Sequence, residues 1–116
     1  MKFSSALKLN HIFRRLYSSS GQANSYLVLY ARKNHTATNR VGLTVSKKLG
    51  CAVVRNRVRR RLREIYRLHE DQLVCGRDVV IVARVRAANS TYQQLEKSFL
   101  YLASKLELLK KEQDKV

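Results

Sequence analysis

A run of arginines interrupted by apolar residues at helical spacing constrains this chain more than any other feature. Six of the nine residues from 55 to 63 are arginine. At about 100° per residue, apolar and basic side chains separate onto opposite faces of a helix. The apolar face holds Val54, Val58, Leu62, Ile65, Tyr66 and His69. The basic face holds Asn56, Arg59, Arg60, Arg63 and Arg67. The pattern predicts a surface helix from Val53 to about Leu73.

The other segments predict a mixed fold in a single domain. A short first helix is indicated by Leu9, Ile12, Phe13, Leu16 and Tyr17. Alternating residues predict strands at 26–31 and 40–46, and a hairpin is their simplest pairing. The apolar run 79–83 predicts a strand covered on both faces. An apolar seam over 91–111 predicts a last helix packed on the sheet, since a coiled coil would need more heptads. The order α-β-β-α-β-α indicates an α+β sandwich.

Charge is distributed very unevenly along the chain. Residues 1–63 contain fifteen Lys and Arg and no acid, whereas residues 64–116 contain nine basic and eight acidic residues. The first part therefore carries +15 of the net charge of +16. Because such charge opposes compaction unless a polyanion neutralises it, nucleic acid is the predicted partner and an anionic membrane surface the alternative. No apolar stretch reaches the roughly 18 residues of a membrane-spanning helix.

Two groups of residues could bind RNA. Lys47 and Lys48 precede Gly50, which can turn the backbone toward the start of the arginine-rich helix. The guanidinium groups of that helix would form bidentate hydrogen bonds with phosphate oxygens or stack on bases. The second group is aromatic. Its tyrosines combine an apolar ring with a polar hydroxyl, which suits a partly exposed groove where unpaired bases stack on the rings. Core packing is the alternative, above all for the phenylalanine. This second group consists of Phe13, Tyr17 and Tyr30, with Arg32 and Thr44 alongside.

The sequence offers no pattern for protein catalysis. The acidic residues are scattered, and the three histidines have no Asp, Ser or Cys at an informative spacing. Cys51 and Cys75 form no Cys-x-x-Cys pair and have no histidine nearby, so we expect free thiols, no zinc site and a cytoplasmic location. The basic, serine-rich residues 1–20 also fit a mitochondrial transit peptide. Their apolar residues have a better use in the first helix.

Residues 40–60 resemble the signature of the bacterial ribonuclease P protein subunit. The matching stretches are RVGLTVSKKLG at 40–50 and AVVRNRVRR at 52–60. The Arg-Asn-Arg at 55–57 corresponds to that family's namesake element, and the similarity extends over about residues 7–109. The resemblance implies one RNA-binding domain over 1–116, with short disordered ends at 1–5 and 112–116. It also implies a left-handed β-α-β crossover, as in a ribosomal-protein domain.

The same resemblance implies a function and a set of sites. The protein would be the noncatalytic subunit of ribonuclease P, an endoribonuclease that removes the 5′ leader of precursor tRNA. It would be a monomer in a 1:1 ribonucleoprotein without a membrane partner, and the catalytic RNA would hold most of the required Mg²⁺. The residues expected to contact that RNA are Lys47, Lys48, Arg55, Asn56, Arg57, Arg59, Arg60, Arg63 and Arg67. The leader groove would comprise Phe13, Tyr17, Tyr30, Arg32 and Thr44, with Arg55 and Asn56 at the boundary of both surfaces.

Three other functions compete with this interpretation. A small basic α+β domain would fit ribosomal RNA equally well by charge, so a ribosomal or ribosome-assembly protein is the alternative. A nuclease that acts alone is disfavoured because carboxylates and histidines are not clustered. A DNA-binding protein is disfavoured because no helix-turn-helix or dimer spacing can be read.

Overall fold

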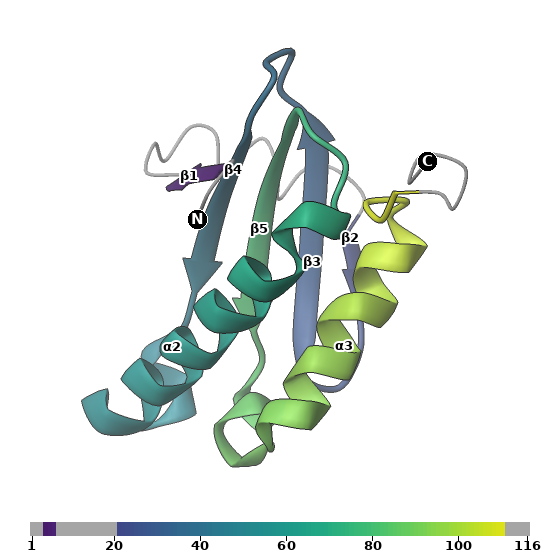
Figure 1. Cartoon of the computed structure of the whole chain (residues 1–116). Helices are drawn as coiled ribbons and strands as arrows, with labels where there is room; N and C mark the ends of the chain where they lie inside the picture. Colours follow the sequence, from purple (N-terminus) through teal and green to yellow (C-terminus); the bar gives the residue numbers. More distant parts are fainter. Residues whose placement is uncertain (1–3, 7–20, 111–116) are drawn as a thin grey trace.

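The computed structural model describes residues 4–6 and 21–110, which form a sheet with two long helices (Figure 1). The strands are β1 (Ser4–Ala6), β2 (Gly21–Ala23), β3 (Leu27–Lys33), β4 (Asn39–Thr44) and β5 (Arg77–Ala83). The long helices are α2 (Ala52–His69) and α3 (Tyr92–Lys105). Short 3-10 helices form η1 (Lys47–Leu49), η2 (Glu70–Gln72) and η3 (Val85–Asn89). The predicted first helix, with Phe13 and Tyr17, lies outside the described residues.

The predicted hairpin of the two early strands is wrong. The sheet order is β1-β4-β5-β3-β2, so β5 lies between β3 and β4. β3 pairs with β5 antiparallel, and β4 pairs with β5 parallel. The most apolar strand thus takes the central position, where neighbouring strands pair with both of its edges. β1 and β2 were not predicted, and β1 includes residues 4 and 5, which were expected to be disordered.

The connection from β4 through α2 to β5 is left-handed, as the resemblance implied. Both long helices cover one face of the sheet, and α2 runs back in front of the parallel pair it connects (Figure 1). Tracing the chain with the strands pointing upward and α2 in front leads from β4 to a strand on its left. Most such crossovers are right-handed. The path leaves the beginning of α2 beyond the end of the sheet, at the lower left of Figure 1.

The core fills the space between the sheet and the two helices. Strand residues that point toward the helices are buried, among them Leu27, Leu29 and Ile81. In α2 the predicted apolar face is confirmed, because Val58, Leu62, Ile65 and Tyr66 are buried while Val54 and His69 are half-buried. In α3 the buried apolar residues are Leu95, Phe99, Leu102 and Ala103. The rings of Tyr66 and Phe99 meet edge to face at 6.2 Å, which joins the helices.

Both helices end earlier than the periodicity predicted. After α3, Glu107 adopts a φ of 57°, and the backbone N–H of Leu108 donates to the carbonyl of Ala103. The chain then runs beside the segment that follows α2. Val74 N–H donates to the Leu108 carbonyl at 2.7 Å. The apolar residues after α3 therefore pack against that segment, which explains why they continued the helical seam without being helical.

Candidate RNA-binding surfaces

The chain reaches the arginine-rich helix through a turn made by η1 and Gly50. Gly50 has a φ of 140°, which side chains rarely permit, and Lys47 and Lys48 are exposed just before it. Cys51 is the N-cap of α2, and its side chain makes no capping hydrogen bond. The free N–H groups of Val54 and Val53 lower the pKa of the exposed Cys51 thiol. This end of α2 therefore stabilises negative charge, as expected of a helix N-terminus.

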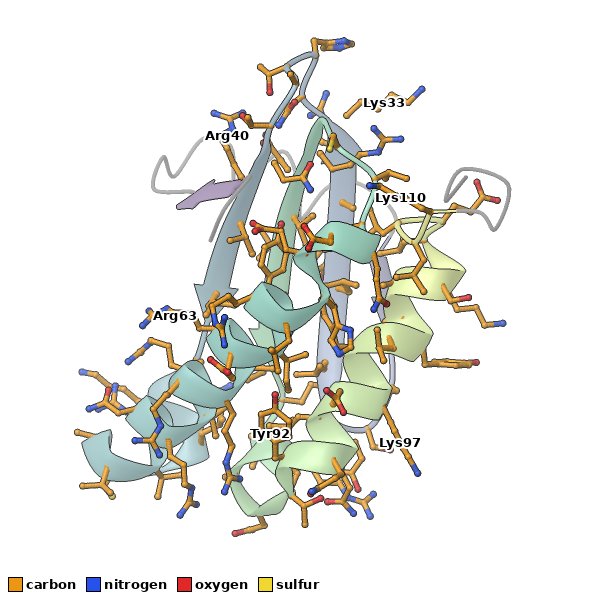
Figure 2. All side chains as sticks on the ribbon, viewed as in Figure 1. Lys33, Arg40, Arg63, Tyr92, Lys97 and Lys110 are labelled. Carbon is orange, nitrogen blue, oxygen red and sulfur yellow. The ribbon has the colours of Figure 1, made fainter. Side chains whose placement is uncertain are left out.

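The outward side of α2 carries a basic hollow directly opposite the core. Its volume is about 640 Å³. The residues that line it are Val53, Asn56, Arg57, Arg59, Arg60 and Arg63. Figure 2 shows Arg63 on the side of α2 that faces away from α3. Five of the nine residues predicted to contact RNA thus surround one concave surface, and this surface contains no carboxylate. We call these six lining residues the basic hollow.

Hydrogen bonds hold two guanidinium groups of the basic hollow. Arg57 Nη2 donates to the backbone carbonyl of Ala88 in η3 at 3.1 Å. Arg59 Nη1 donates to Asn56 Oδ1 at 2.8 Å. Each guanidinium keeps further N–H donors for a ligand, and its restricted motion reduces the entropy lost on binding. Arg61, which was not predicted to contact RNA, donates to the Ser90 carbonyl at 3.0 Å and helps to fix α2 on the chain that precedes α3.

Two other residues predicted to contact RNA, Arg55 and Arg67, do not line the basic hollow. Arg67 Nη2 lies 2.6 Å from Glu64 Oε1, and both side chains are about half exposed. The hydrogen bond from Arg67 lowers the pKa of the Glu64 carboxyl, so Glu64 stays ionised and compensates the charge of Arg67. Arg55 is half-buried, next to the core side of the helix. The uncompensated outward charge of α2 is therefore concentrated between Arg57 and Arg63.

The second surface is the face of the sheet opposite the two helices. Strand register places its residues in rows across β3, β5 and β4. One row is Tyr30, Val80 and Gly42, and the next is Val28, Val82 and Thr44. Arg32 lies in the row on the other side of Tyr30. The predicted groove residues Tyr30, Arg32 and Thr44 therefore share one face over roughly 13 Å of strand. The predicted contributors Phe13 and Tyr17 lie outside the described residues.

The ring of Tyr30 packs against Gly21. Gly21 pairs with Tyr30 across β2 and β3. A Cβ atom at Gly21 would lie 2.6 Å from Tyr30 Cε1, closer than side chains tolerate. The ring therefore leans over the glycine, and a larger residue would displace it. The sequence analysis missed this contact because it depends on the pairing of β2 with β3, and no strand was predicted at Gly21.

An ion pair closes the loop end of this sheet face. Asp78 is 3% exposed and accepts hydrogen bonds from Arg40 Nε at 2.7 Å and Nη2 at 2.6 Å. Asn34 Nδ2 also donates to Asp78 at 3.0 Å. Arg40 is thereby occupied by a buried carboxylate, whereas Arg32, in the same row, is exposed. Of these two arginines, Arg32 is the better placed to contact a phosphate.

The acidic, histidine and cysteine side chains of the described residues are spread over the fold. Within residues 4–6 and 21–110, no three His, Cys, Asp or Glu side chains gather as metal ligands. His69 Nε2 lies 3.0 Å from Glu96 Oε2, so this predicted packing residue also joins α2 to α3. No helix among the described residues is long and apolar enough to cross a membrane.

The family model and the relatives described here all belong to one protein family. Residues 1–107 match the family model named Ribonuclease P. The ribonuclease P protein component of Alkaliphilus metalliredigens is 40% identical over 110 residues, which cover 94% of this chain and 99% of the relative. That of Natranaerobius thermophilus is 42% identical over 106 residues, covering 90% and 92%.

Solved structures agree with these relatives. The RNase P protein of Staphylococcus aureus superposes with a TM-score of 0.82 at 31% identity, over 90% of this chain and 97% of that one. The RNase P protein from Thermotoga maritima gives a TM-score of 0.78 at 26% identity, over 87% and 96%. Sequence and structure therefore point to the same group of proteins.

Proposed function

Because this chain belongs to the ribonuclease P protein family, it is the protein component of an endoribonuclease for tRNA 5′ processing, and we propose how its two surfaces divide that work. The basic hollow of α2 binds the catalytic RNA. The face of the sheet opposite the helices, where Tyr30, Arg32 and Thr44 lie, binds the single-stranded 5′ leader of precursor tRNA. The ribosomal-protein alternative gives way to the family match, which covers residues 1–107.

One observation carries the assignment of α2 to the catalytic RNA. Its outward side gathers Arg57, Arg59, Arg60 and Arg63 around a hollow without a carboxylate, and its other side is buried in the core. A protein surface that only needed solubility would mix both signs of charge. Positive charge on this side neutralises phosphates that would otherwise repel one another, and each contact releases counterions. Lys47 and Lys48 extend the same field to the turn before the helix.

The assignment of the leader rests on the composition of the sheet face opposite the two helices. Tyr30 offers a ring whose position is set by Gly21, Thr44 offers a hydroxyl, and Arg32 offers an exposed guanidinium. Aromatic rings stack on unpaired bases of any identity, which suits leaders of varied sequence. β4 ends at Thr44, and the chain then passes through η1 into α2. The two proposed surfaces therefore meet near the start of α2, where Arg55 and Asn56 lie just after its first residues.

Several finer points belong to the same proposal. The catalytic RNA holds the Mg²⁺ ions of the holoenzyme, because the described part of the protein groups no suitable ligands. The protein acts as a monomer in a 1:1 complex and works in the cytoplasm. The phosphate environment of the RNA and the basic surfaces of the protein together bring the substrate to those ions.

The experiment that tests the proposal asks which tRNA, precursor or mature, depends on the sheet face for binding. Affinities of the holoenzyme for precursor and mature tRNA are compared for the wild type and for Tyr30→Ala. Loss of a base stack costs about 1–3 kcal/mol, so precursor binding should weaken roughly tenfold while mature tRNA binding stays unchanged. Tyr101→Ala is the matched control, because Tyr101 is 55% exposed on α3, away from both surfaces. Equal weakening of both ligands by Tyr30→Ala would refute the leader assignment.

A further inference from the structure

One apolar side chain is among the residues that line the basic hollow. Val53 is 74% exposed, the largest exposed fraction among the large apolar residues of the described chain. It occupies the second helical position of α2 and lines the hollow together with Arg57 and Arg60. Phosphate groups are fully hydrated anions and gain nothing from an exposed valine. The surface therefore combines arginines with an exposed valine, and contacts to the RNA sugar–phosphate backbone would not require the valine.

We propose that the basic hollow receives an unstacked base of the catalytic RNA, with the base lying on Val53 and with arginines holding its flanking phosphates. This inference rests on the proposed function, since it names what the same surface recognises. Arg57 and Arg60 follow Val53 by four and seven residues, which places all three side chains along one line of the helix. A planar base fits between this apolar contact and planar guanidinium groups, which also stack on bases.

Shape and fixed side chains support a base rather than a phosphate alone. The volume of about 640 Å³ lies within the range of small-molecule sites. Arg57 is held by the Ala88 carbonyl and Arg59 by Asn56, so two sides of the hollow have a defined position before RNA binds. Asn56 consequently acts as a positioning residue for Arg59. Contacts to the RNA backbone would need only positive charge, whereas this hollow also presents the apolar side chain of Val53.

Charge complementarity identifies the occupant as RNA. Four guanidinium groups and no carboxylate line the recess. Free N–H groups at the start of α2 add positive potential beside it, and they lower the pKa of the neighbouring Cys51 thiol. An apolar peptide would leave these charges buried and unpaired. A nucleotide satisfies both requirements, because its base is apolar on its faces and its phosphates are anionic.

Salt dependence distinguishes an apolar contact from an ionic one. Affinity of the purified protein for the catalytic RNA is measured over a range of salt concentrations for wild type, Val53→Ser, Val53→Lys and Arg60→Ala. Val53→Ser should weaken binding about fivefold without changing the slope of log affinity against log salt, because no charge is lost. Arg60→Ala should weaken binding and reduce the slope by roughly one.

Val53→Lys gives opposite results for the two kinds of site. A base that lies on Val53 would be displaced by the longer side chain, and affinity should fall. If only phosphates lay over the hollow, the added charge should raise affinity and steepen the slope, and that result would overturn the inference. Leu68→Ser is the matched control, because Leu68 is 51% exposed on the same helix and does not line the hollow. It should leave affinity unchanged.

A second readout identifies the nucleotide itself. Chemical probing of the Watson–Crick edges of the RNA should show a base whose reactivity changes when the wild-type protein binds but not when Val53→Ser binds. Identical reactivity patterns for the two proteins, together with unchanged affinity of Val53→Ser, would refute the base contact. In that case a weakened Arg60→Ala would still support RNA binding by α2. If Arg60→Ala also bound the catalytic RNA with wild-type affinity and an unchanged salt slope, the proposed function would be refuted.

Discussion

The two long helices cover the same face of one sheet, yet their sequences follow different rules (Figure 1). α3 begins with a complete capping box, in which Thr91 accepts from the Gln94 N–H and the Gln94 side chain accepts from the Thr91 N–H. α2 begins at Cys51 without a side-chain cap and without an acidic residue in its first turn. α3 satisfies its own helix end, whereas α2 leaves its N–H donors and arginines available. Both helices contribute to the core, and we expect α2 rather than α3 to contact RNA as well.

This contrast can be tested first at the core of α3. Phe99 is fully buried and packs edge to face on Tyr66. Phe99→Ala should lower the free energy of unfolding by about 3–5 kcal/mol, because it leaves a cavity between the helices. Urea unfolding followed by circular dichroism measures the loss. The remaining folded protein should bind the catalytic RNA with wild-type affinity, and weaker binding by that fraction would mean that α3 also serves the ligand.

The corresponding test on α2 removes two outward arginines. Arg60→Ala combined with Arg63→Ala should weaken binding of the catalytic RNA by about tenfold per contact and reduce the salt slope by roughly two. The free energy of unfolding should change by less than about 0.5 kcal/mol, since both side chains are exposed. Lys97→Ala is the control, because it removes a positive charge from the exposed side of α3 (Figure 2). An unchanged slope in the double variant would argue against phosphate contacts.

Removing the capping box of α3 should have a smaller effect on the free energy of unfolding. Thr91→Ala removes the side-chain acceptor at the start of this helix. Stability should fall by about 1 kcal/mol, and thermal unfolding should show a lower Tm. RNA affinity should stay the same, because the helix start lies among residues assigned to the fold. If the free energy of RNA binding fell by more than the free energy of unfolding, α3 would also have to be assigned a role in RNA binding.

The smallest effect concerns the acidic residue on α2. Glu64 pairs with Arg67 at 2.6 Å. Glu64→Gln should free that guanidinium, raise affinity for the catalytic RNA severalfold at most and slightly steepen the salt slope. Because Arg67 lowers the pKa of Glu64, the wild-type pair persists above the ordinary pKa of a glutamate and is lost as pH falls through the lowered value. The wild type and Glu64→Gln should therefore converge in affinity at acidic pH.

Sequence periodicity predicted the local elements but not their partners. The two faces of α2 followed directly from residue spacing, because a helix fixes which side chains share a face. The pairing of β3 and β4 with β5 could not be read in this way, since strand partners distant in sequence are chosen by burial of the whole sheet. The apolar run at 79–83 carried a partial signal, because a strand covered on both faces belongs at the centre.

The candidate sites show the same limit. Charge and spacing located the arginines of the basic hollow, yet the tether from Arg57 to Ala88 joins residues 31 positions apart, and one of its partners is a backbone carbonyl that any residue would supply. Gly21 under Tyr30 depends on the register of an edge strand that was not predicted. Arg40 and Asp78 likewise meet only through the parallel pairing of β4 with β5. Tertiary contacts of this kind leave no local pattern.

Cleavage of a 5′-extended precursor tRNA at low magnesium tests the central claim most directly. The protein alone, a bacterial catalytic RNA alone, and the two together are compared under the same conditions. The account predicts strong cleavage only for the combination, with the leader released at the mature 5′ end, because the protein contributes binding surfaces and the RNA contributes the chemistry. Cleavage by purified protein alone, or no effect of adding the protein to the RNA, would contradict it.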